Sequence, residues 1–155
     1  SNVGEVLSPA INFDSWIELY NPGSQDVDLG GMTLRDHRGN SWKMPSGIGK
    51  VSAGGFKVVW LGSNDIKADQ ADFKLDCDGG TITLTDKNGN LVAEQAYPEA
   101  MSHTAWARTA DGGDGWGWTA TPTPGATNRT SVFASERLAP PSVSIAVSSS
   151  PALWP

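Results

Sequence analysis

The two histidines of the chain, His37 and His103, are the first residues to test for chemistry. A histidine beside a serine or cysteine activates a nucleophile, and a closely spaced histidine pair binds a metal ion. Both residues lie in loop-like sequence, without a nucleophile-elbow serine or a second histidine at ligand spacing. The sequence also lacks GxSxG, HExxH and GxxxxGK motifs, and its one cysteine, Cys77, has no partner thiol. We therefore predict that the chain is not an enzyme and has no catalytic residues.

Acidic residues in loops offer a second kind of chemistry, because two carboxylates at the right separation catalyse glycoside hydrolysis. Asp65, Asp69 and Asp72 lie in one polar segment and are candidates for such a pair. The fold alone would have to assemble it, and solvated acids on the surface are far more common. The structural interpretation is therefore favoured for all three residues.

Calcium is the metal to consider, because it takes oxygen ligands from loops. The segment 86–90 begins like an EF-hand loop, but its glycine comes too early and no glutamate closes the loop. A hairpin turn explains it fully. Asp111 and Asp114, in the turn DGGDG, are weak calcium candidates. We predict no metal and no cofactor, with calcium at these two aspartates as the alternative.

Tryptophan is unusually frequent, with seven residues in a chain of 155. Flat aromatic rings stack on sugar rings and fill pockets on protein partners. Trp106, Trp116 and Trp118 lie near glycine-rich loops, and Trp116 and Trp118 share one face of a strand by alternation. Two interpretations stay open. The three side chains cover one end of the core, or they form a ligand-binding patch.

The elements that must position these residues are predicted to be short strands, because 18 glycines and 10 prolines favour strands joined by turns. The balance of 11 basic and 17 acidic residues gives a net charge of -6, which repels phosphate backbones and anionic lipids. No apolar run approaches the length of a membrane-spanning helix. We expect neither nucleic acid nor membrane insertion.

Alternation of apolar and polar residues locates the strands. In the segment 16–20, WIELY, Ile17 and Leu19 point one way and predict a half-buried strand. In the segment 81–85, Ile82 and Leu84 point to the core, and Asn88-Gly89 predicts a two-residue type I′ turn. The predicted strands are residues 4–11, 16–20, 32–36, 41–44, 56–61, 73–75, 81–85, 91–97, 105–108 and 115–119.

Six motifs in these segments follow one another in the order of a known family. They are WIELYNPGSQDVDLGGMTLRD (16–36), PSGIGKVSAGG (45–55), GTITLTDKNGNLV (80–92), AWAR (105–108), GWGWT (115–119) and TPGATN (123–128). The chain resembles the lamin tail domain in the form found in secreted and cell-surface bacterial proteins. The resemblance covers residues 4–128 and implies an all-β, immunoglobulin-like β-sandwich, with the segment 4–11 beside 16–20.

The composition changes after residue 128 to serine, proline, alanine and valine, and Val143, Ile145 and Val147 then alternate with small residues. We predict one domain over residues 4–128. Residues 129–155 are predicted to be a linker and the truncated start of a further immunoglobulin-like module.

The resemblance implies a non-catalytic interaction or spacer domain in a larger, multidomain bacterial protein, extracellular or attached to the cell surface. Its partners would be a protein or glycan at that surface and the neighbouring domains of its own chain. A carbohydrate-binding module that uses exposed tryptophans is the alternative. A nuclear scaffold is disfavoured, because no coiled-coil rod or basic targeting segment is seen. The ligand and the oligomeric state stay open.

Overall fold

The computed structural model describes residues 15–62, 68–100, 104–128 and 143–146. Strands make up the regular structure of these residues, apart from one turn of 3-10 helix. The elements are β1 (Ser15–Tyr20), β2 (Val27–Asp28), β3 (Thr33–Asp36), β4 (Ser41–Lys43), η1 (Ser46–Ile48), β5 (Lys50–Val51), β6 (Phe56–Leu61), β7 (Gln70–Ala71), β8 (Gly80–Thr85), β9 (Leu91–Tyr97), β10 (Ala105–Arg108), β11 (Trp116–Thr119) and β12 (Val143–Ala146). None of the described segments forms a helix long and apolar enough to span a membrane.

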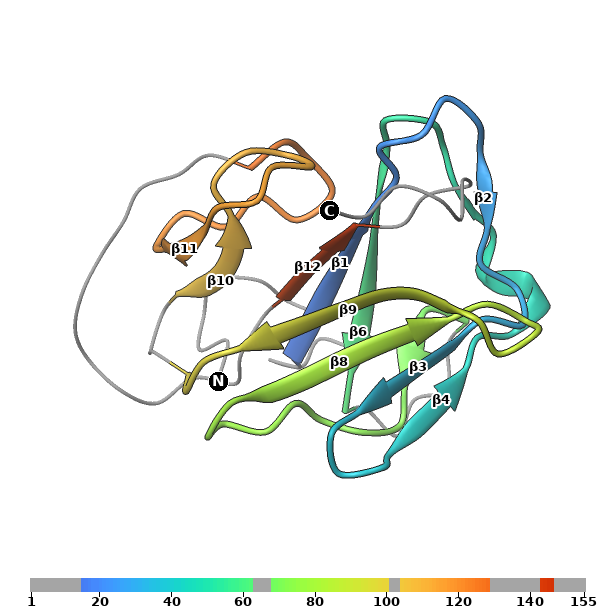
Figure 1. The fold of residues 1–155 in the computed structure, drawn as a ribbon, viewed down its shortest axis with the longest axis horizontal. Helices are drawn as coiled ribbons and strands as arrows, with labels where there is room; N and C mark the ends of the chain where they lie inside the picture. Colours follow the sequence, from blue (N-terminus) through green and yellow to red (C-terminus); the bar gives the residue numbers. More distant parts are fainter. Residues whose placement is uncertain (1–14, 63–67, 101–103, 129–142, 147–155) are drawn as a thin grey trace.

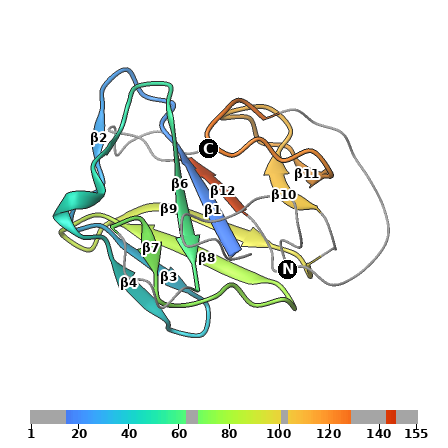
Figure 2. The ribbon, with the colours of Figure 1, turned by 180° about the vertical axis from the view of Figure 1, so that it is seen from behind.

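Two sheets form the two layers of the structure (Figure 1). One has six strands in the order β11-β10-β12-β1-β6-β7, and the other has four in the order β4-β3-β8-β9. The view from behind places β6, β1 and β12 in front of the four-stranded sheet (Figure 2). A two-stranded ribbon of β2 and β5 extends from one end. The all-β, immunoglobulin-like sandwich predicted from the sequence is confirmed.

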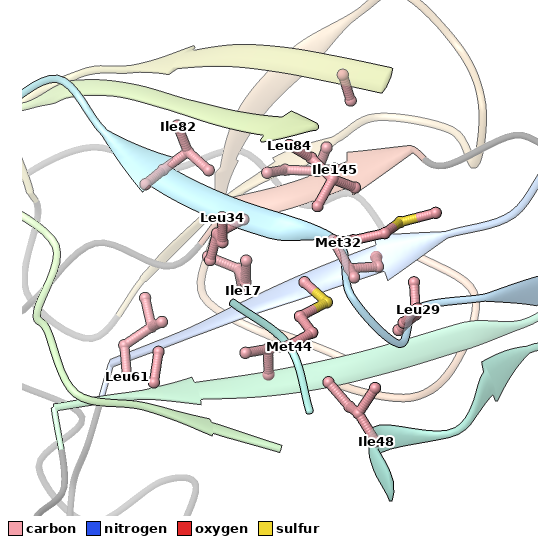
Figure 3. Packing of buried hydrophobic residues seen from close by; sticks show 14 of the residues in the cluster. Ile17, Leu29, Met32, Leu34, Met44, Ile48, Leu61, Ile82, Leu84 and Ile145 are labelled. Atoms are coloured by element: carbon pink, nitrogen blue, oxygen red, sulfur yellow. The ribbon is translucent and has the colours of Figure 1, made fainter. Parts of the chain in front are cut away.

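The core lies between the two sheets and is built by alternation along each strand (Figure 3). Ile17 and Leu19 of β1 and Leu34 of β3 have no exposed surface, and the same holds for Ile82 and Leu84 of β8. Burying a side chain of this size contributes about 1.5–3 kcal/mol. The inward direction predicted for the residues of β1 and β8 is therefore confirmed.

Strand β1 is buried on both faces, although the alternation predicted a half-buried strand. On the face opposite the core, Trp16 is 6% exposed and packs with Trp60 and Ala105, and Glu18 is 1% exposed. This second face of β1 is buried by a segment that is distant in the sequence. The chain after β11 returns over this face, and the backbone N–H of Gly125 donates to Oε1 of Glu18 at 2.5 Å.

The turns after β3 and β8 have the same construction, which the sequence repeats as Asp-x-x-Gly-Asn. Asp86 N–H donates to the carbonyl of Asn90 at 2.8 Å, and Gly89 N–H donates to the carbonyl of Asp86 at 3.0 Å. The central residues are thus 87 and 88, with Gly89 last at φ 87°. The predicted two-residue type I′ turn is wrong, because the carboxylate of Asp86 accepts the N–H groups of Asn88 and Asn90 and holds a longer loop.

Two predictions for the connection between β6 and β8 differ from the structure. The polar segment 62–72 contains β7, which pairs in parallel with Trp60 and Leu61 of β6. Residues 73–75 were predicted to be a strand and are not, because they leave the sheet after β7. Phe73 and Leu75 are nevertheless buried, at 8% and 4% exposed. The alternation of apolar residues here therefore reflects burial of two side chains and not strand pairing. The predicted strand 4–11 lies outside the described residues.

The four described residues after position 128 are part of this sandwich. Strand β12 pairs in parallel with β1, matching Ile17 to Val143 and Leu19 to Ile145. Ile145 is 2% exposed and belongs to the same core cluster as Ile17. These residues therefore belong to the sandwich, whereas the sequence predicted that they begin a separate module. A linker in the rest of residues 129–155 stays a prediction.

Candidate functional site

The β10–β11 hairpin brings the three candidate tryptophans together at one end of the six-stranded sheet (Figure 1). Trp106 lies opposite Trp118, and Arg108 lies opposite Trp116. Residues directly opposite each other, or two apart on one strand, share a face of the sheet. The three tryptophans and Arg108 therefore line one face of the hairpin, and the shared face predicted for Trp116 and Trp118 is found.

The rings of this tryptophan cluster (Trp106, Trp116 and Trp118) contact one another. The Trp106 and Trp116 centroids are 6.3 Å apart with the planes at 16°, and the Trp106 and Trp118 centroids are 5.2 Å apart with the planes at 60°. All three side chains are half-buried. Because Trp106 and Trp116 also pack against the main core, the cluster both closes that end of the sandwich and presents aromatic surface to solvent.

Arg108 adds a cation to the aromatic face, with its guanidinium carbon 4.8 Å from the centroid of the Trp116 ring. Its Nη1 donates to the carbonyl of Gly113, which fixes the side chain against the loop between the two strands. Burial lowers the pKa of Arg108, and the nearby charge of Asp114 partly offsets this. Arginine stays charged at every physiological pH, so this site carries a permanent cation beside Trp116.

The two calcium candidates lie in the same β10–β11 loop. The Oδ1 of Asp111 accepts the backbone N–H of Asn128 at 3.0 Å, and the side chain of Asp114 is exposed near Arg108. Within the described ranges, no three histidine, cysteine or carboxylate side chains come close enough together to hold a metal ion. Calcium usually needs six or more oxygens, so further ligands would have to come from elsewhere. Binding at Asp111 and Asp114 stays a prediction.

Of the acids weighed as a catalytic pair, the structure describes Asp69 and Asp72. Asp69 lies 4.0 Å from the Lys57 ammonium, and Asp72 is exposed. Asp65 and His103 lie outside the described residues. The arrangement of Asp69 and Asp72 thus resembles ordinary surface charge.

A polar cluster that the sequence did not reveal joins the β3–β4 turn to the loop before β8. The carboxylate of Asp76 forms an ion pair with Arg38 and lies 3.7 Å from Nε2 of His37. The backbone N–H of Asp76 donates to Oη of Tyr97 at 3.2 Å. Gly80 makes room for it, because a Cβ at that position would lie 2.2 Å from Nδ1 of His37.

Tyr97 keeps its proton in this cluster. Burial raises the pKa of Tyr97 to about 12, and the negative charges of Asp76 and Asp36 make a smaller contribution to this rise. A phenol that holds its proton is a poor base or nucleophile at neutral pH. The cluster therefore holds two loops together. The repeated Asp-x-x-Gly turns at 36–39 and 76–79 are the one signal in the sequence that points to it.

Comparison with known proteins agrees with this architecture. Residues 3–99 match the Lamin Tail Domain family, a span that includes β1 to β9 and the whole four-stranded sheet. Curated proteins contain no match to the chain. The matched span covers more than half of the 155 residues and ends before the tryptophan cluster. The chain belongs to the lamin tail domain family.

Proposed function

We propose that this chain is a non-catalytic interaction or spacer domain of a larger bacterial protein that is extracellular or attached to the cell surface. It connects neighbouring domains of that protein and binds a protein or glycan at the surface. The lamin tail domain is a non-catalytic, immunoglobulin-like family, which supports an interaction role. The observation that carries the proposal is that the polar side chains Asn21, Glu18 and Asp86 make hydrogen bonds to the protein's own backbone.

Those side chains hold the fold together. Asn21, with no exposed surface, donates to the carbonyls of Gln25 at 2.7 Å and Val51 at 3.1 Å. Glu18 and Asp86 accept backbone N–H groups. Groups committed to such bonds are not available for acid–base or nucleophilic chemistry. The tryptophan cluster, in contrast, presents apolar surface that supports contact with a partner.

Binding to the surface of the bacterium that produces the protein tests this proposal. Fluorescently labelled chain is expected to bind intact cells or isolated cell envelopes saturably. The Trp118→Ala variant should bind at least roughly tenfold more weakly, as for an interface hot spot. Leu91→Ala is the matched control, because Leu91 is 63% exposed and lies outside the tryptophan cluster. Absence of saturable binding, or equal binding by Trp118→Ala, would overturn an interaction role for this face.

Carbohydrate binding is the second candidate, favoured by the near-parallel, half-buried rings of Trp106 and Trp116. Such rings offer flat surface to a sugar. A glycan array, followed by affinity electrophoresis in gels with the best polysaccharide, separates this candidate from protein binding. Retardation that disappears in Trp116→Ala and Trp118→Ala would identify a carbohydrate-binding module. A protein partner predicts no retardation with any polysaccharide.

A further inference from the structure

Strand β12 occupies a slot in the middle of the six-stranded sheet. One neighbour is β1, paired at four positions from Ile17↔Val143 to Tyr20↔Ala146, and the other is β10, paired at Trp106↔Val143. Both pairings are parallel. The tryptophan-bearing hairpin is thus joined to the rest of the sheet through β12, the last strand of the described chain.

The slot recognises a strand through its backbone. Without β12, the facing edges of β1 and β10 would expose rows of unpaired N–H and C=O groups, which is the template that an added strand completes. Neighbouring strands in a sheet lie about 4.8 Å apart, so the space between β1 and β10 fits a single strand. The parallel pairing on both sides fixes the direction in which that strand must run.

The slot also recognises a side chain. Ile145, 2% exposed, lies in the core cluster with Ile17 and Leu84 (Figure 3). Leu19 belongs to the same cluster. β12 packs across from β9 of the opposite sheet. An apolar side chain therefore enters between the two layers at this position, and a hydroxyl or charged group would need a polar partner there.

The occupant is connected to its slot by a long stretch of chain. β11 ends at Thr119 and β12 begins at Val143, so residues 120–142 separate them. A stretch of this length can reach a slot on an adjacent molecule, since an extended chain spans about 3.3 Å per residue. Every copy of the chain carries both the slot and the matching strand, and this makes exchange between two copies self-complementary.

We propose that β12 is an exchangeable strand, and that the slot between β1 and β10 accepts residues 143–146 of a second copy. Reciprocal exchange gives a two-fold symmetric dimer in which each sandwich keeps the same contacts. The partner is a second copy of this chain, and the recognised unit is an extended Val-Ser-Ile-Ala segment with Ile145 in the core.

Energy transfer between labelled copies tests the exchange. Cys77 is exposed and has a free thiol, so separate batches can be labelled there with donor and acceptor dyes, which also blocks disulfide formation. The batches are mixed at high concentration in mild denaturant, returned to buffer and separated by size. We expect a dimer fraction with energy transfer for the full chain and for the control Leu91→Asp, and none for Ile145→Asp.

A peptide of residues 142–148, Ser-Val-Ser-Ile-Ala-Val-Ser, gives an independent measurement. It should compete with dimer formation and bind Ile145→Asp roughly tenfold or more tighter than the unmodified chain, whose own strand fills the slot. The same peptide with aspartate at position 145 should not bind. If near-UV circular dichroism shows Ile145→Asp unfolded, Ile145→Thr takes its place.

Three results would overturn the proposal. They are the absence of energy transfer, energy transfer that persists in Ile145→Asp, and peptide binding without any dimer. The second would place the dimer contact on another surface, and the third would remove the second copy as the occupant.

Discussion

The Oε1 of Glu18 accepts the backbone N–H of Gly125 at 2.5 Å, across 107 positions of the sequence. Glu18 comes from the centre of β1 and Gly125 from the turn that follows β11. The two residues belong to different motifs of the resemblance, WIELYNP and TPGATN. This contact explains why an acid occupies a buried strand position, because its carboxylate fastens the returning chain over β1.

Removal of this acceptor should destabilise the domain. We expect Glu18→Ala to lower the free energy of unfolding by about 1.5–3 kcal/mol, the usual loss for a hydrogen bond to a charged group. Glu18→Gln keeps an acceptor oxygen and a similar shape, so it should lose less. Urea unfolding followed by tryptophan fluorescence gives both values. Equal losses for the two variants would show that the oxygen does not carry the contact.

The core predicts a contrast between buried and exposed leucines. Leu84→Ala removes a side chain with no exposed surface between the two sheets and should cost about 2–5 kcal/mol. Leu91→Ala, at a position 63% exposed, should change stability by less than about 0.5 kcal/mol. Denaturant midpoints of the two variants test this directly. Similar midpoints would mean that the two sheets do not enclose Leu84.

Gly39 and Gly79 have nearly equal φ angles but different surroundings. Comparing their alanine variants therefore separates the cost of the left-handed backbone from the cost of a steric clash. Gly39 has φ 91° and open space at its Cβ position, and Gly79 has φ 92° with backbone atoms of Tyr97 and Pro98 at 2.9 Å. Gly39→Ala should cost about 1–2 kcal/mol from the left-handed conformation alone. Gly79→Ala should cost clearly more, since backbone must also move. Thermal unfolding of both variants is the measurement, and equal losses would contradict the close approach.

Acid should weaken the β8–β9 turn through Asp86. Hydrogen bonds from the side chain and backbone of Asn90 lower the pKa of Asp86 below its ordinary value of 3.8. Stability from a lowered carboxyl pKa is present above the unfolded value and is lost as the pH falls through the folded value. Asp86→Asn should therefore lose stability at pH 7 and show a shallower decline below about pH 4. Asp72→Asn, at an exposed position, is the control.

Calcium should leave the stability of the domain unchanged. Asp111 is already bonded to the N–H of Asn128, so Asp111→Asn should lower the melting temperature equally with roughly 5 mM calcium and with chelator. Differential scanning fluorimetry of the unmodified chain under both conditions is the primary measurement. A calcium-dependent rise that disappears in Asp114→Asn would establish a site in this loop.

The parts of the fold that follow from neighbouring residues were predictable from the sequence. Alternation located β1, β8 and β9, and it placed Ile82 and Leu84 in the core. The turn of Asp86 was mistaken because the carboxylate, and not the Asn-Gly pair, sets the loop length. The burial of Glu18, the insertion of β12 and the contact of His37 with Asp76 depend on segments distant in sequence. No local pattern encodes such contacts, so they required coordinates.

The candidate site was predictable in part for the same reason. Alternation put Trp116 and Trp118 on one face, and the hairpin then added Trp106 and Arg108 by direct pairing. The cation beside the Trp116 ring was missed, since Arg108 lies on the neighbouring strand and its orientation depends on the carbonyl of Gly113.

The position of β12 also bears on how the chain folds as it leaves the ribosome. Synthesis runs from the N-terminus, so β1 emerges long before the strand that completes its ladder at Leu19↔Ile145. Contacts between such distant segments require closure of a large loop, and proteins rich in them fold slowly. The edge of β1 that pairs with β12 therefore stays open in the nascent chain until β12 has left the ribosome, and a chaperone would be most useful during that interval.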